Sequence, residues 1–220
     1  MALIQRSDGL GIERRAAIPV QGVWDRMEQW KAKRDYGESV NPTDLHPEEL
    51  SDDMSLRLNP MWYPLKEFPR KLLLERLNAR WIFTVADNGD IYIGVDRISG
   101  TIEKDEFERL LRGMREKDPT LTGGRLRNSL DRQGHPTVGA RFESDGKTKI
   151  GSARIAGHLE WNEENERFEV NEFSGRYMSS DARPTFSATH NDTNPKHLNN
   201  VARRMSSQLN VEIHAASAFS

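Results

Sequence analysis

Runs of apolar residues in the second half of the chain predict strands. Two β-prone runs, residues 81–85 and 91–95, flank a short polar segment whose Asn88-Gly89 pair supplies the positive φ that tight turns require. A longer apolar run extends from Ile150 to Trp161, with a break in alternation before Ala153, and turns back into residues 167–170. We therefore expect two β-hairpins.

Two further short runs are predicted as strands. Residues 138–142 follow a Pro-containing segment, and residues 211–213 close the organised part of the chain. Together with the hairpins they predict one antiparallel or mixed sheet.

Apolar positions at helical spacing predict helices around this sheet. The clearest helix begins at Asn194 and Pro195, a favoured N-cap and a favoured first-turn residue. Its apolar positions are Leu198, Val201, Ala202, Met205 and Leu209. Residues 102–117 and 65–79 are also predicted to be helical, the latter despite Pro69, which belongs in a first turn or produces a kink.

The N-terminal third has a different character. Trp24, Met27 and Trp30 fall at helical spacing and predict an amphipathic helix, whereas the prolines and acids of residues 36–47 are typical of a loop. We predict an N-terminal arm and helical extension over residues 1–79 and a core domain over residues 80–216. The fold class is α+β, with helices flanking the sheet.

The predicted hairpins frame several polar residues. The unperturbed pKa of a histidine side chain is about 6.5, so His135 suits a general base or a ligand contact, or else is a turn residue whose ring bonds the backbone. Thr137 and Ser174 offer hydroxyls that attack a substrate or cap the backbone. The Arg176 guanidinium suits a carboxylate or phosphate, Gly175 permits a tight turn, and Tyr177 stacks on a ligand or packs over the sheet.

These elements, taken in order, resemble the core of plant calmodulin-binding IQ-motif proteins and similar bacterial and fungal domains. The resemblance covers about residues 80–215 and rests on residues 81–83, 91–94, 135–137, 156–159 and 174–177. The chain departs from the family pattern at Pro136-Thr137 and at Arg176, where the family has a histidine. The resemblance implies a fold more than an activity, and because the IQ motif itself is missing, calmodulin is not expected as a partner.

A His-x-Thr element followed by a tyrosine also resembles the nicotinamide pocket of ADP-ribosyltransferases. This resemblance implies an alternative in which His135, Thr137 and Tyr177 are catalytic, while residues 174–176 bind a nucleotide or another anion and NAD is used. The pattern assigns no catalytic glutamate. The candidates are Glu160, Glu169 and Glu172.

Composition argues against several functional classes. The chain has 220 residues, no cysteine and a formal net charge of −2, so it lacks both thiolate chemistry and the broad positive charge of nucleic-acid binders. Its six histidines show no familiar metal-ligand spacing, and outside the NAD alternative we expect no cofactor. No apolar run is long enough to cross a bilayer and no secretory signal is evident, so we expect a cytoplasmic protein without a membrane partner.

The preferred interpretation is a cytoplasmic interaction protein, of the kind found among bacterial immunity or effector-associated proteins, that binds one protein partner. Aromatic side chains anchor such interfaces efficiently. The candidate anchors are Trp24, Trp30, Trp62 and Tyr63. The competing interpretation of the same residues is ordinary packing of the N-terminal helices on the sheet.

Overall fold

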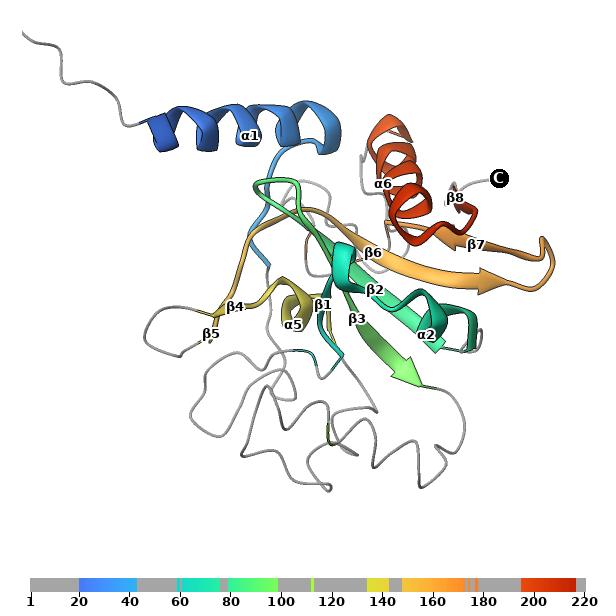
Figure 1. Cartoon of the computed structure of the whole chain (residues 1–220). Coiled ribbons are helices and arrows are strands. Elements are labelled where there is room, and N and C mark those ends of the chain that lie inside the picture. Colours follow the sequence, from blue (N-terminus) through green and yellow to red (C-terminus); the bar gives the residue numbers. More distant parts are fainter. Residues whose placement is uncertain are drawn as a thin grey trace, which may run out of the picture.

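The computed structural model describes residues 20–42, 59, 61–75, 79–98, 112, 134–142, 148–172, 174, 177 and 195–216. These residues form a mixed sheet with helices on both faces, which confirms the predicted α+β class (Figure 1). The predicted helix over residues 102–117 lies outside the described residues, apart from Arg112.

The central sheet has six strands in the order β1-β3-β2-β6-β7-β8. Strands β7 and β8 run parallel, and every other neighbouring pair is antiparallel. The strands are β1 (Tyr63–Pro64), β2 (Ala79–Ala86), β3 (Ile91–Ile98), β6 (Ala153–Asn162), β7 (Arg167–Val170) and β8 (Ile213–Ala215). Both predicted hairpins are confirmed, and Gly89 adopts a φ of 87° in the turn between β2 and β3.

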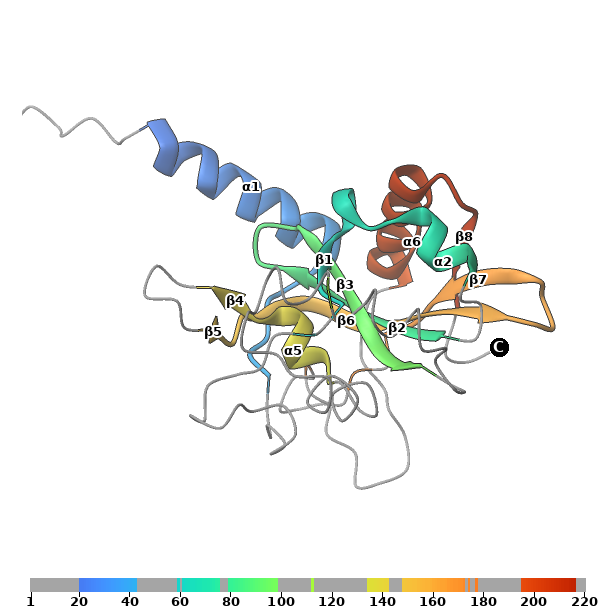
Figure 2. The same cartoon turned by 60° about the horizontal axis from the view of Figure 1, so that its bottom comes forward.

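One face of the sheet carries the main hydrophobic core. Helix α6 (Pro195–Leu209) covers it together with the 3-10 turn η2 (Leu65–Glu67) and helix α2 (Arg70–Glu75) (Figure 2). All five apolar positions predicted for the last helix are buried in this core. The segment predicted as one helix over residues 65–79 is two short helical pieces on either side of Pro69, because proline lacks the N–H that a continuous helix needs.

Residues from the predicted N-terminal extension belong to the same core. Strand β1 pairs with β3 at the edge of the sheet. Met61, Leu65, Phe68 and Leu73 are buried beside residues of β2 and α6. The described residues from 61 to 75 are therefore packed with the sheet.

The opposite face of the sheet is covered by the short helix α5 (His135–Gly139), which leads into β4 (Arg141–Phe142), paired with β5 (Thr148–Lys149). The strand predicted over residues 138–142 is therefore wrong for residues 138 and 139, which are helical. Pro136 favours the helical first turn, and the Thr137 carbonyl accepts a hydrogen bond from Asn59 N–H instead of pairing with a strand.

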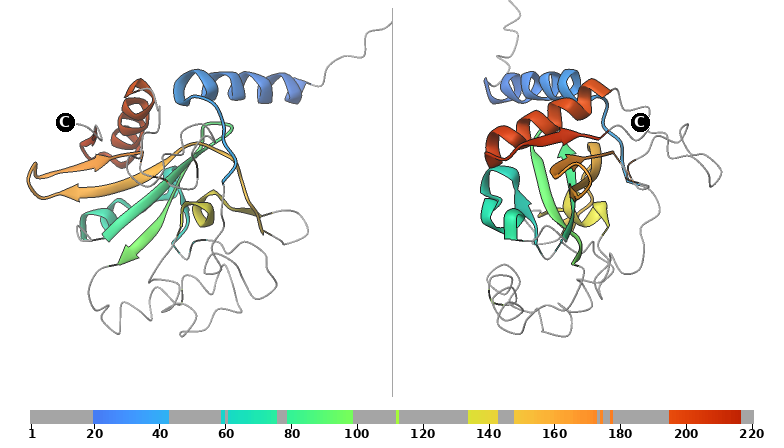
Figure 3. Two further views of the ribbon diagram at one scale, coloured as in Figure 1. Left: turned by 180° about the vertical axis from the view of Figure 1, so that it is seen from behind. Right: turned by 90° about the vertical axis from the view of Figure 1, so that its right-hand side faces the viewer.

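Helix α1 (Val20–Tyr36) packs against the body only near its C-terminal end. Ala32 and Tyr36 are buried there, beside α6. The rest of the helix extends past the sheet, as the left view in Figure 3 shows. The N-terminal helix predicted from the sequence is confirmed.

Candidate functional site

His135, the first predicted catalytic residue, is held by the backbone of the sheet. It is buried at the start of α5, and its Nε2 lies 3.0 Å from the carbonyl oxygen of Gly157 in β6. The centre of its ring lies 5.2 Å from that of His158. This geometry matches the alternative in which the ring bonds the backbone, since that nitrogen is already used to attach α5 to the sheet.

Thr137 is likewise committed to structure. Its hydroxyl donates to the carbonyl oxygen of Gly134 at 2.8 Å and accepts from Asn59 Nδ2 at 3.2 Å. Asn59 also pairs with the backbone of Val95, donating to its carbonyl at 2.8 Å and accepting from its N–H at 3.2 Å. Asn59 thus joins α5 to β3, a role that its position before a proline did not reveal in the sequence.

Ser174 and Tyr177 are buried against the same face of the sheet. The Tyr177 hydroxyl donates to the carbonyl oxygen of Gly151 at 2.9 Å, and Ser174 Oγ accepts from the Tyr177 N–H at 3.4 Å. Gly139 of α5 approaches the tyrosine so closely that a Cβ atom there would lie 2.2 Å from the hydroxyl oxygen. Gly175 and Arg176, the other predicted ligand-binding residues, lie outside the described residues.

A polar cluster lies beside His135 on β2, β3 and β6. Arg80 pairs with Asp96, with 2.5 Å between Nε and Oδ2. Burial, reinforced by the positive charge of Arg80, lowers the pKa of His158, although Asp96 and a hydrogen bond with Asn171 oppose this shift. His158 is therefore held in its neutral form near neutral pH.

The three candidate glutamates differ in their contacts, although Glu160 and Glu169 are register partners on β6 and β7. Glu160 accepts a hydrogen bond from Asn171 Nδ2 at 3.1 Å. Burial alone would raise the pKa of Glu169, but hydrogen bonds from Asn162 and Arg167 outweigh it and lower the pKa. Burial raises the pKa of Glu172. Within the described ranges, no group of three or more histidine and carboxylate side chains is arranged to hold a metal ion.

The predicted aromatic anchors divide into two pairs. Trp62 and Tyr63 pack on the body. The Trp62 indole stacks on Tyr92 with ring centres 4.9 Å apart and donates to the carbonyl oxygen of Val138 at 2.9 Å. Tyr63 is partly buried and meets Phe68 edge to face.

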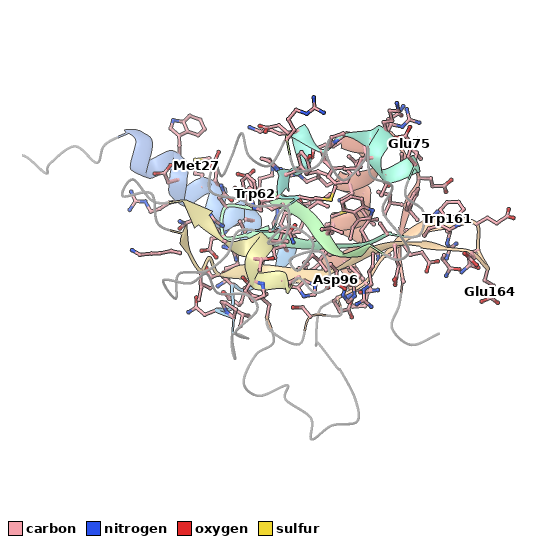
Figure 4. The ribbon with its side chains drawn as sticks, turned by 90° about the horizontal axis from the view of Figure 1, so that it is seen from below. Met27, Trp62, Glu75, Asp96, Trp161 and Glu164 are labelled. Atoms are coloured by element: carbon pink, nitrogen blue, oxygen red, sulfur yellow. The ribbon has the colours of Figure 1, made fainter. Side chains whose placement is uncertain are left out.

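Trp24 and Trp30 lie instead on the outward face of α1. Their exposed fractions are 58% and 65%, and Met27 between them is 56% exposed. Spacing of three residues places these side chains along one face, which we call the aromatic stripe. Figure 4 shows Met27 on the projecting helix and Trp62 over the sheet. The two pairs therefore differ, because Trp62 and Tyr63 contact the body and Trp24 and Trp30 are exposed.

Arg154 on β6 fixes the end of the helix that carries the stripe. Its guanidinium donates to the carbonyl oxygens of Gly37 at 2.6 Å, Asp87 at 2.8 Å and Gln29 at 3.4 Å. Three carbonyls from α1, the segment after it and the β2–β3 turn therefore share one cation. This attachment holds the C-terminal end of α1 against the body, whereas the side chains of residues 24–30 are exposed.

Beside α1 lies an open groove of about 360 Å³, which we call the α1–α6 groove. Its lining residues are Asp35, Tyr36, Asn200, Arg203, Arg204, Ser207 and Gln208. Arg204 donates to the carbonyl oxygen of Gly89 at 2.6 Å, and Asn200 donates to that of Asp35 at 2.8 Å. Asp35 is the one carboxylate among the lining residues, against two arginines, and Arg204 also forms an ion pair with Asp90 at 3.8 Å.

Comparison with known proteins gives no relative. No family model, no curated protein and no solved structure matches the chain. The resemblance to the IQ-motif family core remains a prediction. In the part of the chain that the structure describes, no helix combines the length and apolar content needed to cross a membrane.

Proposed function

We propose that the chain is a protein-interaction protein whose partner binds the aromatic stripe of α1. The observation that carries this proposal is the exposure of Trp24, Met27 and Trp30 on one helix face. A run of large apolar side chains left in water is costly unless another surface covers it. Tryptophan is also the residue type most enriched at the energetic centres of interfaces.

The remaining tryptophans support the contrast. Trp81 is fully buried, Trp62 stacks on Tyr92, and Trp161 packs edge to face on Phe168 with 5.0 Å between ring centres. The fold accommodates three of its five tryptophans by packing them and leaves two on α1. Among the five tryptophans, high exposure is therefore specific to this helix.

The enzyme alternative draws no support from the contacts of its catalytic candidates. His135, Thr137 and Tyr177 each use a side-chain polar atom to bond a backbone carbonyl, and all three are buried. A binding role of the kind played by bacterial immunity or effector-associated proteins fits the stripe better. We place this activity in the cytoplasm, which suits a chain without cysteine.

The test is position-specific photo-crosslinking in the source cells. A benzophenone amino acid replaces Met27, and a matched chain carries it at Glu164, which lies at the far end of the β6–β7 hairpin in Figure 4. We expect one protein adduct of defined mass from position 27 and none from position 164. The adduct disappears when Trp24 and Trp30 are replaced by serine in a chain of unchanged melting temperature.

Two results contradict the proposal. One is the absence of an adduct at position 27. The other is the same set of adducts from both positions, because that indicates random collisions instead of a binding surface.

A further inference from the structure

The aromatic stripe continues into positive charge along α1. Lys31 and Arg34 lie within about 40° of Met27 around the helix axis, whereas Asp25, Glu28 and Asp35 lie about 80° or more away. Arg34 also reaches over the Trp30 ring, with its Cζ 5.4 Å from the ring centre. The outward face of α1 is therefore apolar and cationic, with Glu28 and Asp35 on its flanks and Asp25 on the opposite side.

This cationic face leads into the α1–α6 groove. Lys31 lies one turn before Asp35, the acidic residue of the groove. The pKa of Asp35 is lowered, chiefly by its hydrogen bond from Arg34, with contributions from the positive charges of Lys31 and Lys196. Asp35 is thus ionised and paired with Arg34, and Arg203 and Arg204 face the same space from α6.

The two helices differ in charge from the whole chain. Helices α1 and α6 carry seven lysines and arginines against three aspartates and glutamates, and α6 has no acidic residue. The whole chain has a net charge of −2. Basic charge is therefore concentrated on the surface that contains the stripe and the groove.

We infer that the partner presents an acidic amphipathic segment, whose apolar side chains cover the aromatic stripe while its carboxylates bind Lys31 and the arginines of the α1–α6 groove. This inference rests on the proposed function and adds the chemistry of the partner. Complementary charge beside an apolar anchor steers association and fixes the orientation of the bound segment.

A second copy of the chain fits the stripe less well. Its three side chains expose roughly 400 Å², so a symmetric pair would bury about 800 Å² in total, below the roughly 1,200 Å² of a stable interface. A nucleic acid needs a wider positive surface than a chain with a net charge of −2 provides. A lipid surface would meet the carboxylates of Glu28 and Asp35 on the flanks of α1.

The experiment uses the full chain and two labelled synthetic helical peptides as probes. Both peptides carry leucines along one face, and the other face is glutamate in one and lysine in the other. Fluorescence anisotropy at low and high salt gives the affinities. We expect the acidic peptide to bind at least about tenfold more tightly than the basic one, with an advantage that shrinks as salt rises.

Charge reversal locates the site. Lys31→Glu and Arg203→Glu are each expected to weaken binding of the acidic peptide by about tenfold. The matched control is Lys66→Glu, an equal change of charge on η2, where the side chain is 74% exposed. The control is expected to leave the affinity unchanged. The double substitution Trp24→Ser and Trp30→Ser is expected to weaken the binding of both peptides.

Several outcomes overturn the inference. They are equal binding of the two peptides, no binding of the acidic peptide up to about 1 mM, an equal loss with Lys66→Glu, or tighter binding of single-stranded DNA or phosphatidylserine vesicles. If the photo-crosslinker at position 27 gives a specific adduct and any of these results is obtained, the proposed function is kept and only the acidic character of the partner is rejected. If position 27 gives no adduct, both the proposed function and the acidic partner are rejected.

Discussion

Gly157 lies so close to Asn171 that a Cβ atom on the glycine would fall 1.7 Å from the asparagine carbonyl oxygen. The Gly157 carbonyl oxygen lies 3.0 Å from His135 Nε2, and Asn171 N–H donates to the carbonyl of His158 at 3.0 Å. The absence of a side chain at this position lets the end of β7 close against β6 while α5 attaches to the same strand. Gly157 therefore contributes both to the approach of β7 to β6 and to the attachment of α5.

Gly157→Ala is therefore expected to destabilise the protein strongly. The obstructing atoms are backbone, so the added methyl forces the strands apart, and we expect a loss above about 3 kcal/mol in the free energy of unfolding. Urea unfolding followed by circular dichroism measures this loss. The matched control is Gly22→Ala in α1, where no atom lies within 4 Å of the new Cβ and where alanine favours the helix by about 1 kcal/mol. Similar stability of the two variants would contradict the close approach.

The attachment of α5 makes a second prediction, at Asn59. Its side chain makes four hydrogen bonds in the interior, to Met61, Val95 and Thr137. Asn59→Ala leaves the Val95 backbone groups unpaired, so we expect a loss of about 2–4 kcal/mol, measured by the same unfolding experiment. Asn199→Ala is the control, because Asn199 is exposed and bonds only its own helix through Pro195. A loss at Asn59 no larger than at Asn199 would refute the structural role.

Local signals explain why the hairpins and α6 could be predicted from the sequence. The Asn88-Gly89 pair favours the turn between β2 and β3, and Pro195 favours the first turn of α6, so each signal concerns only a few neighbouring residues. The apolar spacing of α6 repeats over its whole length. Helix α5 carries such a signal only at Pro136, and its five residues are too few for a repeated apolar spacing. Its five residues are helical because Asn59, far away in sequence, bonds Thr137 and because the helix is buried on the sheet.

The candidate site could be predicted only as a set of residue types. A single sequence cannot distinguish a buried histidine that bonds a carbonyl from a catalytic histidine. The positions of His135 and Tyr177 in the sequence therefore did not show which way their side chains point. The spacing of Trp24 and Trp30 predicted an apolar face on α1 but not that this face points to solvent. The exposure depends on the attachment of α1 to the body near its C-terminal end, and Arg154 makes part of that attachment through carbonyl groups far from it in sequence.

Removal of Arg154 is expected to loosen α1 without unfolding the sheet. Arg154→Ala deletes the donors to Gly37, Gln29 and Asp87, so hydrogen exchange should accelerate in the last turns of α1 and stay unchanged in β2. Arg154→Lys should not restore protection, because one ammonium group cannot span three carbonyls. The control is Arg26→Ala, since Arg26 is exposed and its Nε bonds Gly22 within the helix. Equal acceleration in both alanine variants would argue against the attachment.

The neutral state of His158 predicts a loss of stability in mild acid. Its pKa in the folded protein is below the unfolded value of 6.5, mainly because of burial and then the charge of Arg80. The unfolded chain therefore binds more protons as the pH falls through 6.5, so stability is full above that pH and declines below it until the folded-state pKa is reached. Burial, followed by the charge of Lys196, lowers the pKa of His197 as well and adds to the same decline.

Urea midpoints at about pH 7.5 and 5.5 measure this decline. His158→Gln is expected to make the difference between the two midpoints smaller than in the unaltered chain, and adding His197→Gln should reduce it further. Asp35 and Glu169 have lowered carboxyl pKa values and lose stability only at more acidic pH. Glu172, whose pKa is raised by burial, acts in the opposite direction, but its contribution is common to all the chains compared. An unchanged difference in the His158→Gln variant would show that this histidine is protonated as readily in the folded chain as in the unfolded one.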